Sequence, residues 1–363
     1  MILKAGSGTL TANEELLDRA LAHASLLERL KESEVRRIVG MLNRDVLPDL
    51  IDRLRARLER INLRGLDGDQ LRTQRFQDLI DGIQAILREG LRTLRDEHTT
   101  QLVEVAQHES RWQAQALSRS ITIEAEFQLP SVATLRSIVT ARPFQGHLLK
   151  DWWDELGKNT AKRVRGQITI GLAEGQDVDA IVRRIRGTQA LGYRDGILQT
   201  TRREAETVVR TAVQHVTAHA REETMRENED LVKGVQMVAT LDTRTSPFCQ
   251  QIDGKVFKVG EGPRPPFHPN CRTQSVPVLK SWKELGLKGL HEGTRASMDG
   301  QVPESTTYLD WITKQSAERQ DAALGPARAA LLRSGKFTAE ELRRIGPSGR
   351  PLTLAELAKL EAA

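Results

Sequence analysis

Residues 235–278, VQMVATLDTRTSPFCQQIDGKVFKVGEGPRPPFHPNCRTQSVPV, decide the fold because their patterning is β-type in an otherwise helical sequence. Residues 235–242, 252–259 and 273–278 are rich in β-branched residues or alternate between apolar and polar ones. The Asp253-Gly254 pair in the second run is typical of a tight turn. We therefore expect a small sheet of at most three strands. Such a sheet has too small a hydrophobic core to be stable by itself, so it must pack against helices or be held by a cross-link.

The same stretch contains the only two cysteines of the chain, Cys249 and Cys271, with His268 three residues before the second. Zinc prefers thiolate and imidazole ligands, and these residues can supply three of its four tetrahedral positions. Asp242, Asp253 or water could complete the set. Two buried thiols, or a disulfide formed outside a reducing cytosol, explain the same residues. The spacing alone does not decide between structural zinc, a disulfide and free thiols.

The N-terminal third is patterned as long amphipathic helices. Apolar residues recur every three or four positions in two stretches, which predicts a buried face on each helix. These residues are Leu47, Leu50, Ile51, Leu54, Leu58 and Ile61, then Leu79, Ile83, Ile86, Leu87 and Leu94. The turn-like residues 62–70 separate the stretches. Gly90 is the residue that most weakens the second of these predicted helices, since glycine in a helix costs up to about 1 kcal/mol relative to alanine.

Shorter helices with clear boundary signals follow. Gly175 is placed to end one helix, and Asp177 is placed to cap the next. Two reciprocal capping boxes are expected in the C-terminal part: Thr338 with Glu341, and Thr353 with Glu356.

The expected fold class is mainly α, with a small α+β module toward the C-terminus. Long N-terminal helices precede a helical middle, a short sheet around the Cys/His loop and a helical tail. The predicted division is a long-helix region at 1–125, a helical lead-in domain at 130–232, the β module at 233–280 and the tail at 281–363.

Composition restricts the class of protein only broadly. Lys and Arg number 54 against 49 Asp and Glu, for a net charge of +5, and the charges are intermixed. This balance permits nucleic-acid contact without demonstrating it. No apolar stretch approaches the roughly 18 residues that a membrane span needs. The N-terminus has too short an apolar segment for a secretory signal, so we expect an intracellular site of assembly.

Catalytic patterns are weak. His215 and His219 have the spacing of a zinc-protease helix, but Val216 stands where the general base would be. There is no G-x-S-x-G motif for a nucleophilic serine. Residues 268–271, HPNC, suggest a nuclease of the His-Asn-His type, yet the further ligands of such a site are missing downstream.

Residues 238–278 resemble the phage Mu F-like minor head protein family, also called the phage head morphogenesis family. The upstream residues 171–185 and 208–220 resemble the helical lead-in of the same family, so the likeness covers roughly residues 130–280. The tail is similar to the ending of some phage members. The matching positions within the β module are Leu241-Asp242, Arg244-Thr245, Cys249, Asp253-Gly254, Val256-Phe257, Pro266, His268, Pro269, Asn270, Cys271 and Arg272.

The resemblance implies a structural virion protein, present in few copies near the portal vertex of a phage head. Such proteins are assembled in the host bacterial cytoplasm and aid procapsid assembly and genome packaging or delivery. Expected partners are the portal ring, capsid or scaffold proteins, and double-stranded DNA. Enzymatic activity is not expected, although relatives can carry fused toxin domains. The alternatives are a DNA-binding virion protein acting on the packaged genome and, third, a metal-dependent nuclease or toxin.

Cys249, His268, Cys271 and Asp242 are the expected metal ligands, with structural zinc as the expected metal. Many members of the family have cysteine where this chain has Ser246 and Thr273. If the two absent cysteines belong to one linkage of their own, their loss leaves the site of Cys249, His268 and Cys271 intact. If all the cysteines are ligands of a single metal, this chain would bind no metal. The residues expected to lock the surrounding loops are Arg244, Asp253, Gly254 and Arg272.

Overall fold

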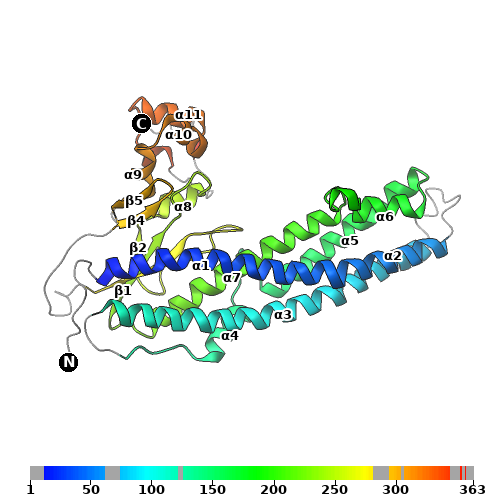
Figure 1. Ribbon diagram of the computed structural model, residues 1–363, viewed down its shortest axis with the longest axis horizontal. Helices are drawn as coiled ribbons and strands as arrows, with labels where there is room; N and C mark the ends of the chain where they lie inside the picture. The colour runs from blue at the N-terminus through cyan, green and yellow to red at the C-terminus, as the bar shows by residue number, and fades with distance from the viewer. Residues whose placement is uncertain are drawn as a thin grey trace. The chain divides into compact units, whose positions relative to one another are not determined.

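The sheet that the sequence predicts is present as three antiparallel strands in the computed structural model of the chain (Figure 1). The structure describes residues 12–61, 74–121, 126–280, 294–303, 306–343, 352–353 and 356. The predicted fold class is confirmed, because helices dominate and the sheet is followed by a helical tail. The turn predicted at 62–70 lies outside the described residues.

The helices in chain order are α1 (Ala12–Met41), α2 (Leu47–Ile61), α3 (Gln74–Ser120), α4 (Val132–Ala141), α5 (Leu149–Ala173), α6 (Val178–Arg186), α7 (Leu198–Arg226), α8 (Pro247–Ile252), α9 (Tyr308–Thr313), α10 (Ala317–Leu324), α11 (Pro326–Arg333) and α12 (Ala339–Leu342). Short helical turns are η1 (Leu42–Val46) and η3 (Gln189–Leu191). The strands are β1 (Val232–Val238), β2 (Val256–Phe257), β3 (Gln274–Leu279), β4 (Thr294–Ser297) and β5 (Gly300–Pro303).

The chain divides into two compact units whose boundaries fall inside α1, α3, α4 and α7. Unit 1 comprises Met1–Glu28, Ala106–Leu135 and Gln214–Ala363, and unit 2 comprises Arg29–Val105 and Arg136–Val213. The four-part division predicted from the sequence stays a prediction.

Unit 2 is built from the amphipathic helices that the periodic stretches predict. Of the predicted apolar residues in α2 and α3, those with described side chains are buried. In this unit α6 packs against both α2 and α5. Gly175, with φ of 65°, follows the end of α5, and the Asp177 side chain caps α6 by accepting a hydrogen bond from the backbone N of Ala180 at 2.7 Å. Both predicted boundary signals are confirmed.

Gly90 has a packing role that the sequence did not reveal. A Cβ atom at this position would lie 2.6 Å from the Cγ1 atom of Val46 in η1. Real Cβ atoms do not approach neighbours so closely, so only glycine fits without movement of Val46. The close approach accounts for a residue that otherwise weakens the helix.

In unit 1 the strand order is β2-β1-β3, with both outer strands antiparallel to β1. Val235 pairs with Phe257 on one side and with Pro277 on the other. The apolar side chains of β1 form a common core with helix residues such as Leu16, Leu117 and Met225. The sheet therefore packs against helices, as its small size requires. We call residues 232–279, which contain β1, α8, β2 and β3, the sheet module.

We call residues 306–343 the tail; it contains α9 to α12. The predicted capping box is present at α12, where Thr338 and Glu341 exchange hydrogen bonds. Thr353 and Glu356 exchange the same bonds. The described helices include none that is both long enough and apolar enough to span a membrane.

Two glycine substitutions test the close approach at Gly90. We expect Gly90→Ala to lower the free energy of unfolding by about 1–3 kcal/mol, because its methyl group overlaps Val46. Gly166 lies inside α5, and a Cβ there would meet nothing within 4 Å. We therefore expect Gly166→Ala to raise the free energy of unfolding by up to about 1 kcal/mol. Urea titration of both variants checks this, and stabilisation by Gly90→Ala would contradict it.

Candidate metal centre

Three side chains of the sheet module meet in one group. The Sγ atom of Cys249 lies 3.9 Å from Sγ of Cys271 and 3.3 Å from Nε2 of His268. All three ligand atoms lie within 4.8 Å of one another. Both cysteines are buried and His268 is half-buried. The structure brings together three of the predicted ligands, and this group can hold a metal ion.

The short helix α8 positions Cys249, and the sequence analysis did not predict this helix. Ser246 caps it by accepting a hydrogen bond from the backbone N of Cys249 at 3.3 Å, and Pro247 occupies the first turn. Serine followed by proline is a recognised signal for a helix start. That signal could have revealed α8.

A tight turn positions the other two ligands. Asn270 has a φ of 58°, a left-handed conformation that asparagine tolerates, and the backbone N of Cys271 donates to the carbonyl of His268 at 3.2 Å. The Nδ1 atom of His268 donates to the carbonyl of Pro269 at 2.9 Å. Because a carbonyl only accepts, Nδ1 carries a hydrogen and Nε2 is the ring nitrogen nearer the sulfurs. A carbonyl partner of this kind commonly orients a metal-binding histidine.

The distances in the group fit tetrahedral zinc better than a disulfide. Zn–S bonds of about 2.3 Å and Zn–N bonds of about 2.0–2.1 Å place two sulfurs about 3.8 Å apart, and a sulfur and a nitrogen about 3.5 Å apart. The observed separations are 3.9 Å and 3.3 Å. A disulfide needs sulfurs about 2.05 Å apart. No disulfide joins the two cysteines in the structure.

The pKa values of the three side chains in this group shift in different directions. The hydrogen bond with Cys271, together with burial, raises the pKa of Cys249. The hydrogen bonds from Cys249 and His268 lower the pKa of Cys271 to about 4. The contact with Cys271 also raises the pKa of His268. Of the two sulfurs, that of Cys271 is therefore the more readily ionised, and a bound metal would take the place of protons in this group.

Ser246 and Thr273, the two positions where the resemblance implies cysteine in other members, lie at this group. The hydroxyl groups of Ser246 and Thr273 both hydrogen-bond the sulfur of Cys249. Thr273 is also buried, with 2% of its surface exposed. The two hydroxyls therefore flank the Cys/His set.

Asp242, the fourth predicted ligand, is engaged elsewhere. Its carboxylate accepts hydrogen bonds from both terminal nitrogens of Arg272, at 2.7 and 2.8 Å, and from the backbone N of Arg244 at 3.0 Å. Burial would raise the pKa of Asp242, but the Arg272 hydrogen bonds hold it below its ordinary value. The guanidinium of Arg244 is 80% exposed and lies 3.7 Å from the same carboxylate. The structure thus does not place Asp242 with the sulfur and imidazole ligands.

Asp253 and Gly254 hold the turn that leads into β2. The buried carboxylate of Asp253 accepts a hydrogen bond from the backbone N of Ala239 at 2.7 Å through one oxygen. Its other oxygen accepts from the backbone N of Tyr308 at 2.7 Å. Gly254 has a φ of 78°, and its backbone N donates to the carbonyl of Met237 at 2.8 Å. Asp253 is therefore used in backbone contacts on both sides, as a residue that fixes loops.

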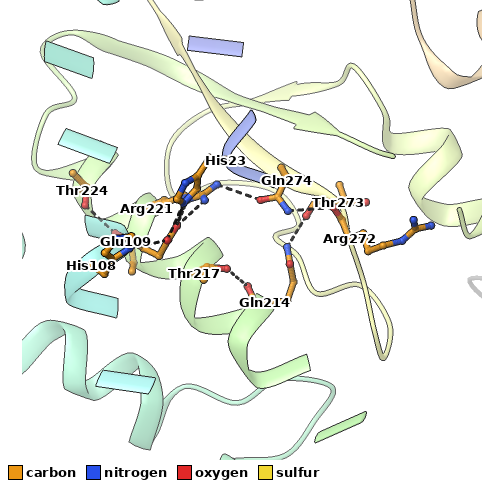
Figure 2. A network of polar contacts seen from close by, with 11 residues as sticks. His23, His108, Glu109, Gln214, Thr217, Arg221, Thr224, Arg272, Thr273 and Gln274 are labelled. Atoms are coloured by element: carbon orange, nitrogen blue, oxygen red, sulfur yellow. Dashed lines mark hydrogen bonds and ion pairs between the residues drawn. The ribbon is translucent and has the colours of Figure 1, made fainter. Parts of the chain in front are cut away.

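A buried polar network behind the sheet module was missed by sequence reasoning. Figure 2 shows it around Glu109, which is fully buried. One carboxylate oxygen accepts from Nε and Nη2 of Arg221 at 2.8 and 2.6 Å, and His23 bonds the other at 2.9 Å. The indole of Trp112 stacks on His23, and the Arg221 guanidinium lies over the same indole, 4.5 Å from its centroid. The network fixes α1, α3 and α7 to one another within unit 1.

The same network reaches the strand that follows Cys271 (Figure 2). Nη1 of Arg221 donates to the side chain of Gln274 at 3.2 Å, and Gln274 donates to the carbonyl of Arg272 at 3.2 Å. Gln214 in α7 donates to the carbonyl of Thr273 at 2.7 Å. Two carbonyls directly after Cys271 are thereby anchored to buried side chains. The helices determine the position of one of the two sulfurs.

The Arg221–Glu109 pair makes a testable contribution to stability. Arg221→Met leaves a buried carboxylate without its cation, and we expect the free energy of unfolding to fall by about 3–5 kcal/mol. Arg226→Met is the matched control, because Arg226 pairs with Glu223 while 42% of its side chain is exposed. We expect the control to lose less than about 1 kcal/mol. Denaturant titration measures both.

Equal losses for the two variants would contradict a special role for the buried pair. The double variant Glu109→Leu/Arg221→Met removes both charges, and we expect it to recover part of the stability that Arg221→Met loses.

The comparisons with known proteins bear on the region around this group. No curated protein and no solved structure matches the chain. One family model, described as Phage Mu protein F like protein, matches residues 162–276. The match includes Cys249, His268 and Cys271 together with α7 and the first half of β3. The resemblance noted from the sequence is thus confirmed for residues 162–276, which are similar to the Phage Mu protein F like family.

Proposed function

We propose that this chain is a structural minor head protein of a tailed phage, present in few copies near the portal vertex. Its role there is to aid procapsid assembly and genome packaging or delivery. The observation that carries the proposal is the Phage Mu F-like domain at residues 162–276. The chain would be assembled in the host cytoplasm and reside in the phage head. Its partners would be the portal ring and capsid or scaffold proteins.

Charge pairing supports protein partners over DNA. Arg163 pairs with Glu204, and Arg210 pairs with both Glu32 and Glu206. Guanidinium groups held by carboxylates are less available for phosphate, and phosphate contacts supply most non-specific DNA affinity. This favours the structural role over the DNA-binding alternative.

The polar groups of the Cys/His site also support a structural role. Its two sulfurs are buried, so a bound zinc would be largely shielded from a substrate. Asp242 is held by two hydrogen bonds from Arg272 and is not available beside the site as a general base. We therefore propose that the site stabilises the module and that the protein is not an enzyme.

Association with head proteins is the direct test of this function. We expect the chain to co-purify with the portal ring of the same phage at high salt, because a packed protein interface resists salt better than phosphate contacts do. The measurement is size-exclusion chromatography of co-expressed proteins. Retention on plasmid DNA that disappears as salt rises would favour the DNA-binding alternative. Metal-dependent plasmid cleavage would favour the nuclease, and failure to bind portal, capsid and scaffold proteins would contradict the proposal.

We further propose that Cys249, His268 and Cys271 hold a structural zinc ion. Zinc would supply a cross-link between α8 and the turn that precedes β3, without redox chemistry. Such a cross-link suits a module whose sheet is small. Metal ligation requires deprotonated sulfur, which the lowered pKa of Cys271 already favours.

Elemental analysis read beside a thiol count tests the zinc proposal. We expect about one zinc per chain in the wild-type protein, and two reactive thiols after chelation and unfolding. Cys271→Ala and His268→Ala should lose the metal and melt at a lower temperature. Asp242→Asn is the matched control and should keep the metal, because its carboxylate contacts Arg272 instead. A metal-free wild type, or one with no free thiols, would contradict zinc.

A further inference from the structure

We propose that the Cys/His group controls the docking of the tail on the sheet module, and that Tyr308 is the residue through which it does so. The inference rests on the proposed zinc site. It adds a consequence of metal binding for residues 306–343, none of which is a ligand.

Tyr308 joins the tail to the module at three points. Its backbone N donates to the carboxylate of Asp253 at 2.7 Å. Its hydroxyl oxygen accepts from the side chain of Gln250 at 3.0 Å and donates to the carbonyl of Asp242 at 3.1 Å. Tyr308 is fully buried, so each bond is shielded from water. Loss of any of the three would leave a buried polar group without its partner, which is costly.

Each of these three partners is placed by a segment that carries a metal ligand. Gln250 follows Cys249 in α8, and Asp253 follows the last residue of that helix. Asp242 is bound through its carboxylate to Arg272, the residue after Cys271. A metal that fixes the Cys249 sulfur relative to the Cys271 sulfur therefore also fixes the docking surface for Tyr308.

The tail has little capacity to keep its structure when undocked. Its helices contain 6, 8, 8 and 4 residues. Isolated helices shorter than about 12 residues are marginal in water. The apolar core of the tail, which includes Tyr308, Trp311, Ile312 and Leu324, is completed by Leu241 from the module. Undocking would expose this apolar surface and loosen the short helices together.

The bonds to Tyr308 and the contact with Leu241 connect the module to the tail. A separate set of contacts, made by Gln214 and by Gln274 with Arg221, anchors the residues after Cys271 to the helices. None of the hydrogen bonds in this second set is made by a proposed metal ligand. Metal removal is therefore expected to act on α8 and the tail before it acts on the helices of unit 1.

Hydrogen exchange of the full-length protein tests the inference, with zinc bound and after removal of zinc by a chelator. We expect chelation to speed exchange of backbone amides in α9 and α10 by about tenfold or more, in line with the loss of one or two buried hydrogen bonds. Amides of α5 in unit 2 serve as the internal reference and should be unchanged.

Tyr308→Phe separates docking from metal binding. We expect this variant to keep its zinc and the protection of β1 and β3, while exchange in α9 and α10 rises. Tyr193→Phe is the matched control, because Tyr193 is the only other tyrosine of the chain and lies in unit 2. The control should show wild-type exchange throughout.

The outcomes distinguish the two proposals. A zinc-loaded protein whose tail exchange does not change on chelation overturns this inference and leaves the zinc site standing. A wild type without zinc overturns both. Wild-type tail exchange in Tyr308→Phe overturns the assigned role of Tyr308.

Discussion

The buried carboxylate of Glu109 is the constraint on which the arrangement of unit 1 depends. A fully buried negative charge is tolerated only when a cation and hydrogen-bond donors compensate it. Here Arg221 and His23 do so, and they come from α7 and α1 while Glu109 belongs to α3. These bonds therefore link the three helices within this unit and favour the register in which the charges meet. Because Arg221 also bonds Gln274 at the start of β3, the same charge pair aligns the sheet.

Local patterns predicted most of the fold. Helix periodicity, the Gly175 and Asp177 boundary signals and the capping box at Thr338 all act over a few residues, and the structure confirms each of them. The small sheet followed from β-branched runs around an Asp-Gly turn. Helix α8 was missed because its six residues lie between two β-type runs and are too few to show periodicity, although its Ser-Pro start was readable.

Contacts between distant residues could not be read from one sequence. Glu109 and Arg221 are separated by 112 positions and look like ordinary charged residues on amphipathic helices. Asp242 was a plausible ligand by residue type, but Arg272 offers it two donors in a geometry that matches a carboxylate. The Cys/His set was recoverable because cysteine is rare in this chain. The grouping in space of Cys249, His268 and Cys271 agrees with that prediction, and the metal they hold stays a proposal.

The range that matches the family model differs from the range that forms the physical unit. Residues 162–276 contain Arg221 but neither Glu109 nor His23, which compensate and orient its charge. The backbone N of Leu279 in β3 is satisfied by the side chain of Asn13, far outside the match. A domain that shares the family sequence therefore completes its buried charges and part of its sheet with helices from elsewhere in the chain.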